Sequence, residues 1–243
     1  MCPEKIMPDV TPSTIASVPT PRRGFFITLE GGEGAGKSTQ SHRLAQRLRT
    51  FGLHVQETRE PGGSPRAEAL RKVLLSGQVA SLGPAAEALL FSAARIDHLD
   101  QTIRPALAGG VTVICDRFAD STRAYQGTLG NVDTRLIRAM ERVAVGTTTP
   151  DLTLILDLPA ETGLARAARR RTGAIDRFEA EDLSFHRALR NSFLDIAAAE
   201  PRRCRVIDGD QPQDDVAEAI WHAVEDRLLA VEHRYASPPA HTA

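Results

Sequence analysis

The strongest chemical signal in the chain is a glycine-rich segment at residues 31–38. It reads GGEGAGKS and fits the spacing G-x-x-x-x-G-K-S/T. Glycines let a backbone wrap around phosphate groups, with successive N–H groups pointing inward at the start of a helix. Lys37 adds a mobile cation, and the hydroxyl of Ser38 is a suitable ligand for Mg²⁺. The segment therefore predicts a site for nucleotide phosphates without indicating which reaction takes place there.

Glu33 is an unusual residue for such a segment, because it places a carboxylate in a loop that attracts anions. Two interpretations stay open. The side chain either points away into solvent, as most glutamates do, or it accepts a hydrogen bond from a second substrate.

Further charged residues stand where predicted strands end. Asp116 and Arg117 directly follow the apolar run at residues 111–115. Ligands of open α/β sheets bind at the carboxyl ends of the strands, so we expect this pair beside the glycine-rich segment. An acidic group there could hold a metal ion or its waters, and an arginine could grip a phosphate; a structural ion pair is the alternative. Arg59 and Arg95 follow a strand and a helical turn, but either alone would be an ordinary surface arginine.

Residues 166–177 carry five arginines in twelve positions against one acidic residue. A solvated helical face is the usual meaning of such a run, and a nucleic-acid patch is a second option. The run lies in a helix that starts near Glu161 and follows a predicted strand. An arginine-rich lid that closes over a triphosphate explains the bias better, because phosphoryl transfer needs positive charge and exclusion of water.

These side chains need a scaffold, and the chain alternates between strand-like and helix-like segments. Strands are predicted at residues 24–30, 53–58, 111–115, 152–158 and around 205–207. Helices are predicted at residues 38–51, 65–76, 84–108 as two helices, near 134–145, from about 161, around 189–196 and around 220–228. Continuous apolar strands separated by helices indicate one α/β domain with a parallel sheet covered on both faces.

Composition excludes several classes of protein. The chain has 243 residues, 42% of them hydrophobic, so it can bury a core and is not wholly disordered. Its 30 basic and 31 acidic residues argue against binding nucleic acid through bulk charge. Cys2, Cys115 and Cys204 are too few and too scattered for a disulfide framework or a zinc cluster. Because no apolar run approaches the ~18 residues of a membrane span, we expect a cytoplasmic protein with no nucleic-acid or membrane partner.

Several separate stretches together resemble the thymidylate kinase family. They are FITLEGGEGAGKST, TREPGG, FSAARIDH, DRFADSTRAYQG, PDLTLILDL and IDRFE, and the resemblance covers about residues 24–230. Many families share the glycine-rich loop, but the REPGG, AAR, DR and AYQG stretches together are specific. The resemblance implies a P-loop nucleoside-monophosphate kinase with a five-stranded parallel sheet. It further implies transfer of a phosphoryl group from ATP to dTMP with Mg²⁺, usually by a homodimer.

The resemblance also implies roles for individual residues. The ATP phosphates would be held by Gly31, Gly32, Glu33, Gly34, Ala35, Gly36, Lys37 and Ser38. The dTMP site would comprise Glu33, Arg59, Phe91, Arg95, Arg117, Ser121, Thr122, Tyr125 and Gln126. Within it, Phe91 would stack on thymine and Arg95 would donate to its O4. The metal would be organised by Ser38 and Asp116.

Catalysis would depend on Lys37, Arg117 and the lid. Family members without a basic residue in the phosphate loop resemble the type whose catalytic arginine lies in the lid, and this chain has only Glu-Gly-Ala there. The candidates are Arg166, Arg169, Arg170 and Arg171, and the sequence does not decide among them. The expected organisation is a flexible Pro-rich leader at 1–22, a P-loop kinase domain at 23–231 with its lid at about 160–178, and a flexible tail at 232–243.

Two alternatives stay open at this point. Another nucleoside-monophosphate or deoxynucleoside kinase could carry the same loop. A non-catalytic nucleotide-binding protein would also fit the loop, although the clustered arginines on the acceptor side speak against it.

Overall fold

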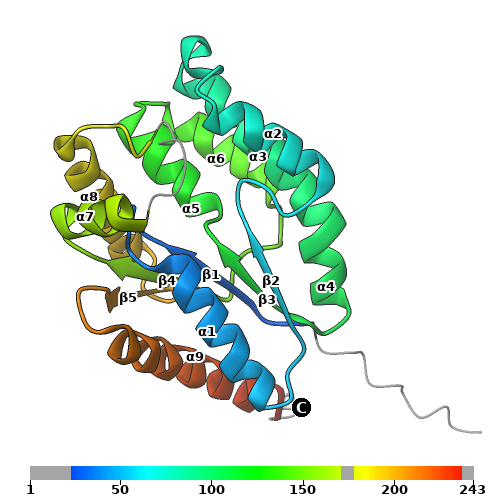
Figure 1. Ribbon diagram of the computed structural model, residues 1–243. Helices are drawn as coiled ribbons and strands as arrows, with labels where there is room; N and C mark the ends of the chain where they lie inside the picture. Colours follow the sequence, from blue (N-terminus) through cyan, green and yellow to red (C-terminus); the bar gives the residue numbers. More distant parts are fainter. Residues whose placement is uncertain (1–22, 171–177, 237–243) are drawn as a thin grey trace, which may run out of the picture.

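A parallel β-sheet forms the centre of the protein. The computed structural model describes residues 23–170 and 178–236, and Figure 1 shows helices on both faces of the sheet. The strand order is β2-β3-β1-β4-β5, and every neighbouring pair is parallel. The strands are β1 Phe26–Glu30, β2 Val55–Arg59, β3 Thr112–Asp116, β4 Leu152–Asp157 and β5 Cys204–Asp208. The predicted five-stranded parallel sheet is confirmed.

Helices cover the two faces with separate apolar clusters. On one face, α1 and α9 pack against the apolar side chains of β1 and β4. On the other face, α8 packs against β4, and the segment that leads into α4 packs against β1 and β3. The long helices are α1 Lys37–Thr50, α2 Pro65–Leu75, α3 Pro84–His98, α6 Thr134–Ala144, α7 Ala160–Arg170, α8 Leu183–Ala199 and α9 Gln213–Ala236.

The edge strand β2 differs from the central strand β1 in composition. Its sequence is VQETR and most of its side chains are partly or fully exposed, whereas all five residues of β1 are buried. The prediction of continuous apolar strands is therefore wrong for β2. An edge strand has a neighbour on only one side, and its charged side chains discourage pairing with another chain.

The helical run at 84–108 contains two helices, as predicted, but no loop separates them. A π-helical turn, η2 (Leu99–Ile103), joins α3 directly to α4 (Arg104–Ala108). Pro105 lies in the first turn of α4. Because proline lacks an N–H and clashes with the carbonyl four residues earlier, the wider turn lets the helix continue past it.

A second helical segment was not predicted from the sequence. It consists of α5 (Ala119–Thr122) and the π-helical η3 (Arg123–Leu129), and it follows β3 directly. It carries the four candidate residues between Ser121 and Gln126. π-helical turns are frequent at functional sites because they change which side chains face one direction.

Some helical residues that the apolar pattern placed on one face do not face the core. In α6, Met140 is buried, but Leu136 and Val143 are 41% and 77% exposed. In α3, which contacts α6, Leu89 and Ile96 are also exposed. The two helices thus present apolar side chains to solvent.

Candidate active site

The phosphate loop connects the central strand β1 to α1. Gly31, Gly34 and Gly36 all have positive φ angles, of 133°, 68° and 90°. A Cβ at Gly34 would also overlap the carbonyl oxygen of Gly163 in the first turn of α7. Glycine is therefore required at Gly34 both for its backbone angle and for the close approach of α7.

Lys37 begins α1 and turns back over this loop. Its Nζ donates to the carbonyl oxygens of Gly31 and Gly32 at 3.1 and 2.7 Å. Burial and the nearby guanidinium of Arg117 lower the pKa of Lys37 to about 8. The ammonium is therefore held among backbone carbonyls, close to the position where an anion would bind.

The side chain of Glu33 points toward the segment that follows β3 and not into solvent. The interpretation of Glu33 as a solvated side chain is therefore wrong. Its carboxylate accepts hydrogen bonds from Arg117 Nη2 at 2.6 Å and from the hydroxyl of Tyr125 at 2.9 Å. Burial acts to raise the pKa of Glu33, but Arg117, Lys37 and the Tyr125 hydroxyl outweigh it and lower the pKa to about 2. The phosphate loop is thereby tied to the segment after β3.

Asp116 and Arg117 have different partners, although they are neighbours at the end of β3. Asp116 accepts a hydrogen bond from Ser38 Oγ at 2.5 Å. Arg117 reaches Glu33 and the carbonyl oxygen of Gly31. The alternative of a simple ion pair between these two residues is therefore wrong, and both side chains lie beside the phosphate loop.

One cavity of about 300 Å³ collects the predicted acceptor residues. Its lining includes all nine residues assigned to that site, Glu33, Arg59, Phe91, Arg95, Arg117, Ser121, Thr122, Tyr125 and Gln126. Lys37, Ser38 and Asp116 line the same cavity. A ligand in this space would touch the phosphate loop at one end and the aromatic side chains at the other.

The aromatic end of the cavity is built by three rings. Phe91 of α3 and Tyr125 of η3 both face Phe178, with ring-centroid distances of 6.4 and 5.1 Å. Phe91 is only partly buried, so it is not a core residue. Phe178 follows directly on the undescribed part of the lid and was not among the predicted site residues. These rings form an aromatic wall of the cavity, against which a flat ring could pack.

Arg95 is not a surface arginine, because its side chain is only 3% exposed. Its Nε donates to Glu60 Oε2 at 2.7 Å, and its Nη2 donates to the carbonyl oxygen of Phe118 and to Thr122 Oγ1. The other oxygen of Glu60 is 3.0 Å from Nδ1 of the fully buried His98. The guanidinium is thus held in one orientation at the cavity wall.

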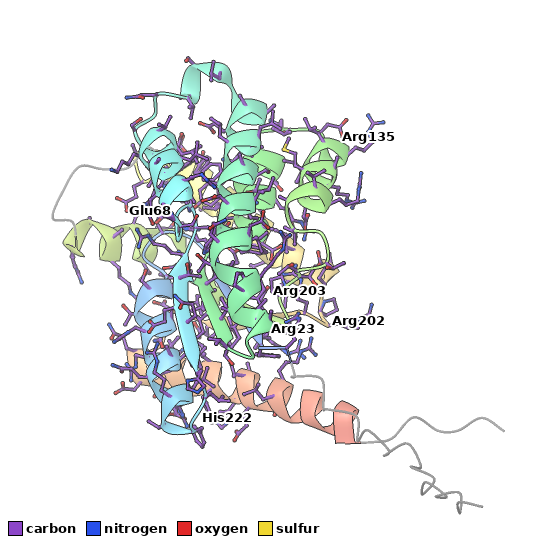
Figure 2. All side chains as sticks on the ribbon, turned by 90° about the vertical axis from the view of Figure 1, so that its right-hand side faces the viewer. Arg23, Glu68, Arg135, Arg202, Arg203 and His222 are labelled. Carbon is purple, nitrogen blue, oxygen red and sulfur yellow. The ribbon has the colours of Figure 1, made fainter. Side chains whose placement is uncertain are left out.

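Arg59 occupies the mouth of the cavity and is half exposed. Its Nη2 donates to both oxygens of Glu68 in α2, at 3.0 and 3.2 Å. Glu68 also accepts from the backbone N–H of Gly63. Figure 2 shows Glu68 on the same side of the molecule as α2.

Of the four candidate lid arginines, the structure describes the side chains of Arg166 and Arg169. Arg166 donates to the carbonyl oxygen of Gly209 at 2.8 Å and contacts Asp210, in the loop between β5 and α9. Arg169 is exposed. The side chain of Arg170 and the whole of Arg171 lie outside the described residues.

Comparisons with known proteins show which family the chain resembles. The family model described as thymidylate kinase matches residues 29–220. A thymidylate kinase of Bradyrhizobium diazoefficiens is 59% identical over 208 residues, covering 85% of this chain and 91% of the relative. One from Nitrobacter winogradskyi is 58% identical over 212 residues, covering 87% and 92%.

The chain belongs to the thymidylate kinase family. A solved structure of a thymidylate kinase from Ehrlichia chaffeensis matches the fold with a TM-score of 0.68 and 35% identity. The match covers 84% of this chain and 99% of the other. No described helix of this family member is long and apolar enough to cross a membrane.

Several residues of this thymidylate kinase site were missed from sequence, among them Glu60, Phe178 and Glu30. Glu60 and Phe178 line the cavity, and Glu30 lies buried behind it. All three stand inside stretches that carried the family resemblance, which was the one available signal. Their contacts could not be read from the sequence, because Glu60 and Arg95 are 35 positions apart.

Proposed function

We propose that this protein transfers the γ-phosphoryl group of ATP to dTMP, giving ADP and dTDP. The observation that carries the proposal is the bridge from Glu33 to Arg117 and Tyr125, which joins the phosphate loop to the acceptor cavity. A phosphate held by Arg117 would then stand next to a triphosphate held by the loop. The acceptor phosphate is already a nucleophile, so positioning and charge neutralisation supply most of the catalysis.

On the donor side, residues 31–38 bind the phosphates of ATP. Lys37 exchanges its two carbonyl partners for the β- and γ-phosphate oxygens, where its charge offsets the charge that moves during transfer. The first turn of α7 rests against the phosphate loop, since a Cβ at Gly163 would overlap the carbonyl oxygen of Glu33. A shift of α7 is therefore transmitted directly to the loop.

Ser38 and Asp116 fit a bound Mg²⁺. Their side-chain oxygens are 2.5 Å apart and line the cavity beside Lys37. Mg²⁺ takes oxygen ligands and usually completes its shell with water and substrate phosphates. When bound, the ion would neutralise charge on the β- and γ-phosphates.

On the acceptor side, Arg59 and Arg117 hold the phosphate of dTMP. Phe91 stacks on thymine, and Arg95 donates a hydrogen bond to its O4 from the orientation set by Glu60. The ring of Tyr125 lies against C2′ of the sugar and disfavours a ribonucleotide. The remaining wall of the pocket is formed by Ser121, Thr122 and Gln126.

In the lid, the four candidates Arg166, Arg169, Arg170 and Arg171 supply the second cation for the transferring phosphoryl group. Arg166 is already bonded to the loop after β5, and Gly209 of that loop lies next to Ala35 of the phosphate loop. This position supports a contact of Arg166 with the nucleoside part of ATP.

We assign the enzyme to the cytoplasm as a homodimer that pairs through α3 and α6. Leu89 and Ile96 of α3, and Leu136 and Val143 of α6, are exposed apolar side chains on two contacting helices. Burying them against a second copy would remove apolar surface from water.

A panel of acceptors tests the proposed function. The purified protein is incubated with ATP and Mg²⁺, and ADP formation is measured with dTMP, dUMP, dGMP, dCMP and thymidine. We expect the largest kcat/KM with dTMP and little turnover of thymidine, which lacks the acceptor phosphate. A clear preference for another monophosphate would reassign the substrate, and nucleotide binding without any transfer would identify a non-catalytic protein.

A further inference from the structure

Arg117 has an unusual backbone conformation. Its φ angle is 70°, in the left-handed region that residues with a Cβ rarely adopt. Such a conformation persists only where the surrounding structure imposes it, and it is found mainly at functional sites. The groups that hold Arg117 in place are therefore part of its function.

Two residues of β1 hold the backbone at Arg117 and at the residue that follows it. The N–H of Arg117 donates to the carbonyl oxygen of Leu29 at 2.9 Å. The next N–H, that of Phe118, donates to Glu30 Oε1 at 2.7 Å. The other carboxylate oxygen of Glu30 accepts from Ser121 Oγ at 2.7 Å, and Arg117 Nη1 is 3.4 Å from the same hydroxyl.

Glu30 is the last residue of β1 and is fully buried. Burial and the nearby Asp120 raise the pKa of its carboxyl group to about 8. A carboxyl group is costly to bury unless its oxygens are hydrogen-bonded, and both oxygens here are bonded to the segment that follows β3. The placement connects Glu30 to Arg117 without any contact with the cavity itself.

We propose that Glu30 is a positioning residue for Arg117. By bonding the N–H of Phe118 and the hydroxyl of Ser121, Glu30 fixes the left-handed turn that aims the Arg117 guanidinium at Glu33 and Gly31 of the phosphate loop. This inference rests on the proposed role of Arg117 in holding the acceptor phosphate. Because Ser121 also lines the pocket, we expect Glu30 to affect the phosphate of dTMP more strongly than its base and sugar.

Three variants of Glu30 separate positioning from packing. Glu30→Gln keeps both bonds, because its amide oxygen can accept from Phe118 N–H and its NH₂ can donate to Ser121. Glu30→Met fills the same space but offers no such partner. Glu30→Asp keeps a carboxyl group, but its side chain is one methylene shorter and does not reach both partners. It is the decisive variant to compare with wild type if Glu30→Met fails to fold.

The matched control is Thr28→Val. Thr28 lies two residues earlier on the same face of β1, is fully buried, and shares a hydrogen bond with Thr153 at 2.7 Å. This variant also removes a buried hydrogen bond from β1, but not one that reaches Arg117. We expect it to lower the melting temperature and to leave dTMP affinity unchanged.

Calorimetric Kd values for dTMP, thymidine and ATP, together with kcat and KM, provide the readout. Glu30→Met should lower kcat/KM for dTMP by about 10²-fold, as expected for a misplaced positioning group. Its Kd for dTMP should rise by a clearly larger factor than its Kd for thymidine, while its Kd for ATP stays near wild type. Glu30→Asp should show the same pattern to a smaller degree, and Glu30→Gln should be close to wild type.

A double-mutant cycle then tests whether Glu30 acts through Arg117. If it does, adding Glu30→Met to Arg117→Ala causes no further loss of dTMP affinity. Additive losses, or equal weakening of dTMP, thymidine and ATP, would overturn the inference. So would a Glu30→Asp variant with wild-type dTMP affinity. If the wild-type protein fails to phosphorylate dTMP, the proposed function is overturned as well. If the wild type is active and Glu30→Met is unaffected, only the positioning role is overturned.

Discussion

The ion pair of Arg95 in the acceptor cavity and that of Arg166 on α7 lie in opposite surroundings. Arg95 and its partner Glu60 have side chains that are 3% and 4% exposed. Arg166 and its partner Asp210 are 37% and 45% exposed, and the second ion pair of α7, Glu161 with Arg187, is also open to solvent. The Arg95–Glu60 pair is enclosed by the fold. The two pairs of α7 can exchange their partners with water or a ligand.

This difference separates two tasks of a phosphotransferase. An enclosed guanidinium has a single orientation before the substrate arrives, so it can select a substrate by geometry. Exposed ion pairs contribute little to stability and are readily replaced. They suit a segment that must open for nucleotide exchange and then close. The acceptor side is therefore expected to set specificity, and the lid to set the rate of transfer.

The largest expected effect is on stability, at Glu60. Glu60→Ala leaves Arg95 buried without its carboxylate, and removing one partner of a buried ion pair commonly costs about 3–5 kcal/mol. Urea denaturation monitored by circular dichroism measures this loss. The matched change in the lid, Glu161→Ala, should leave the free energy of unfolding almost unchanged. Equal effects of the two variants would contradict the contrast between enclosed and exposed pairs.

The next effect concerns Lys37, which belongs to neither group because it is enclosed but released by substrate. Lys37→Ala should lower kcat by about 10²–10³, or ~3–4 kcal/mol of barrier, because a preorganised charge is lost. The fold should be retained, as judged by circular dichroism. Lys72→Ala, on the exposed side of α2, is the control and should have normal kcat. A folded Lys37→Ala enzyme with near-normal kcat would contradict its assigned role.

The same contrast explains how far the sequence predicts the site. The glycine-rich loop and Asp116 could be placed together in advance, because carboxyl ends of parallel strands meet at one edge of a sheet. Strand number and direction followed from apolar runs of the central strands. These predictions rest on local sequence patterns, and the strands and the loop lie in the structure where the patterns place them.

The pairing of charges could not be predicted in this way. Glu60 forms its ion pair with Arg95 and not with Arg59, its neighbour in the chain. Arg59 pairs with Glu68 instead, because the chain after β2 directs the side chains of Arg59 and Glu60 to different places. Arg166 binds a backbone carbonyl of a loop 43 residues away. Partners of this kind depend on packing between distant elements, so only the resemblance to a known family pointed to Arg59 and Arg95, which line one cavity.

In the lid, at least one arginine should matter for the chemical step. Of Arg166→Ala, Arg169→Ala, Arg170→Ala and Arg171→Ala, we expect one or more to lower kcat by about 10²-fold with little change in ATP Kd. That pattern marks an interaction made mainly in the transition state. Steady-state kinetics and calorimetry measure the two quantities. Arg135, which extends from α6 into solvent in Figure 2, provides the control Arg135→Ala. Four single variants with near-normal kcat would remove the catalytic role of the lid.

The smallest expected effect lies where the two regions meet, at Phe91. Its ring faces Phe178, which follows the lid in the chain, across the aromatic end of the cavity. Stacking of an aromatic side chain on a nucleobase is worth roughly 1–3 kcal/mol by alanine substitution. Phe91→Ala should therefore raise the Kd of dTMP and of thymidine while the Kd of ATP stays unchanged.

Phe51→Ala is the matched control for this prediction. Phe51 is 65% exposed and stacks on Trp221, which belongs to the apolar cluster of α1 and α9 and does not line the cavity. Its loss should leave both nucleotide affinities unaltered. If Phe91 only packed against its neighbours, Phe91→Ala would lower the melting temperature and change the affinities for dTMP and ATP together or not at all. Measuring the melting temperature beside the three Kd values therefore decides whether α3 contributes a base-stacking ring or merely a wall to the acceptor cavity.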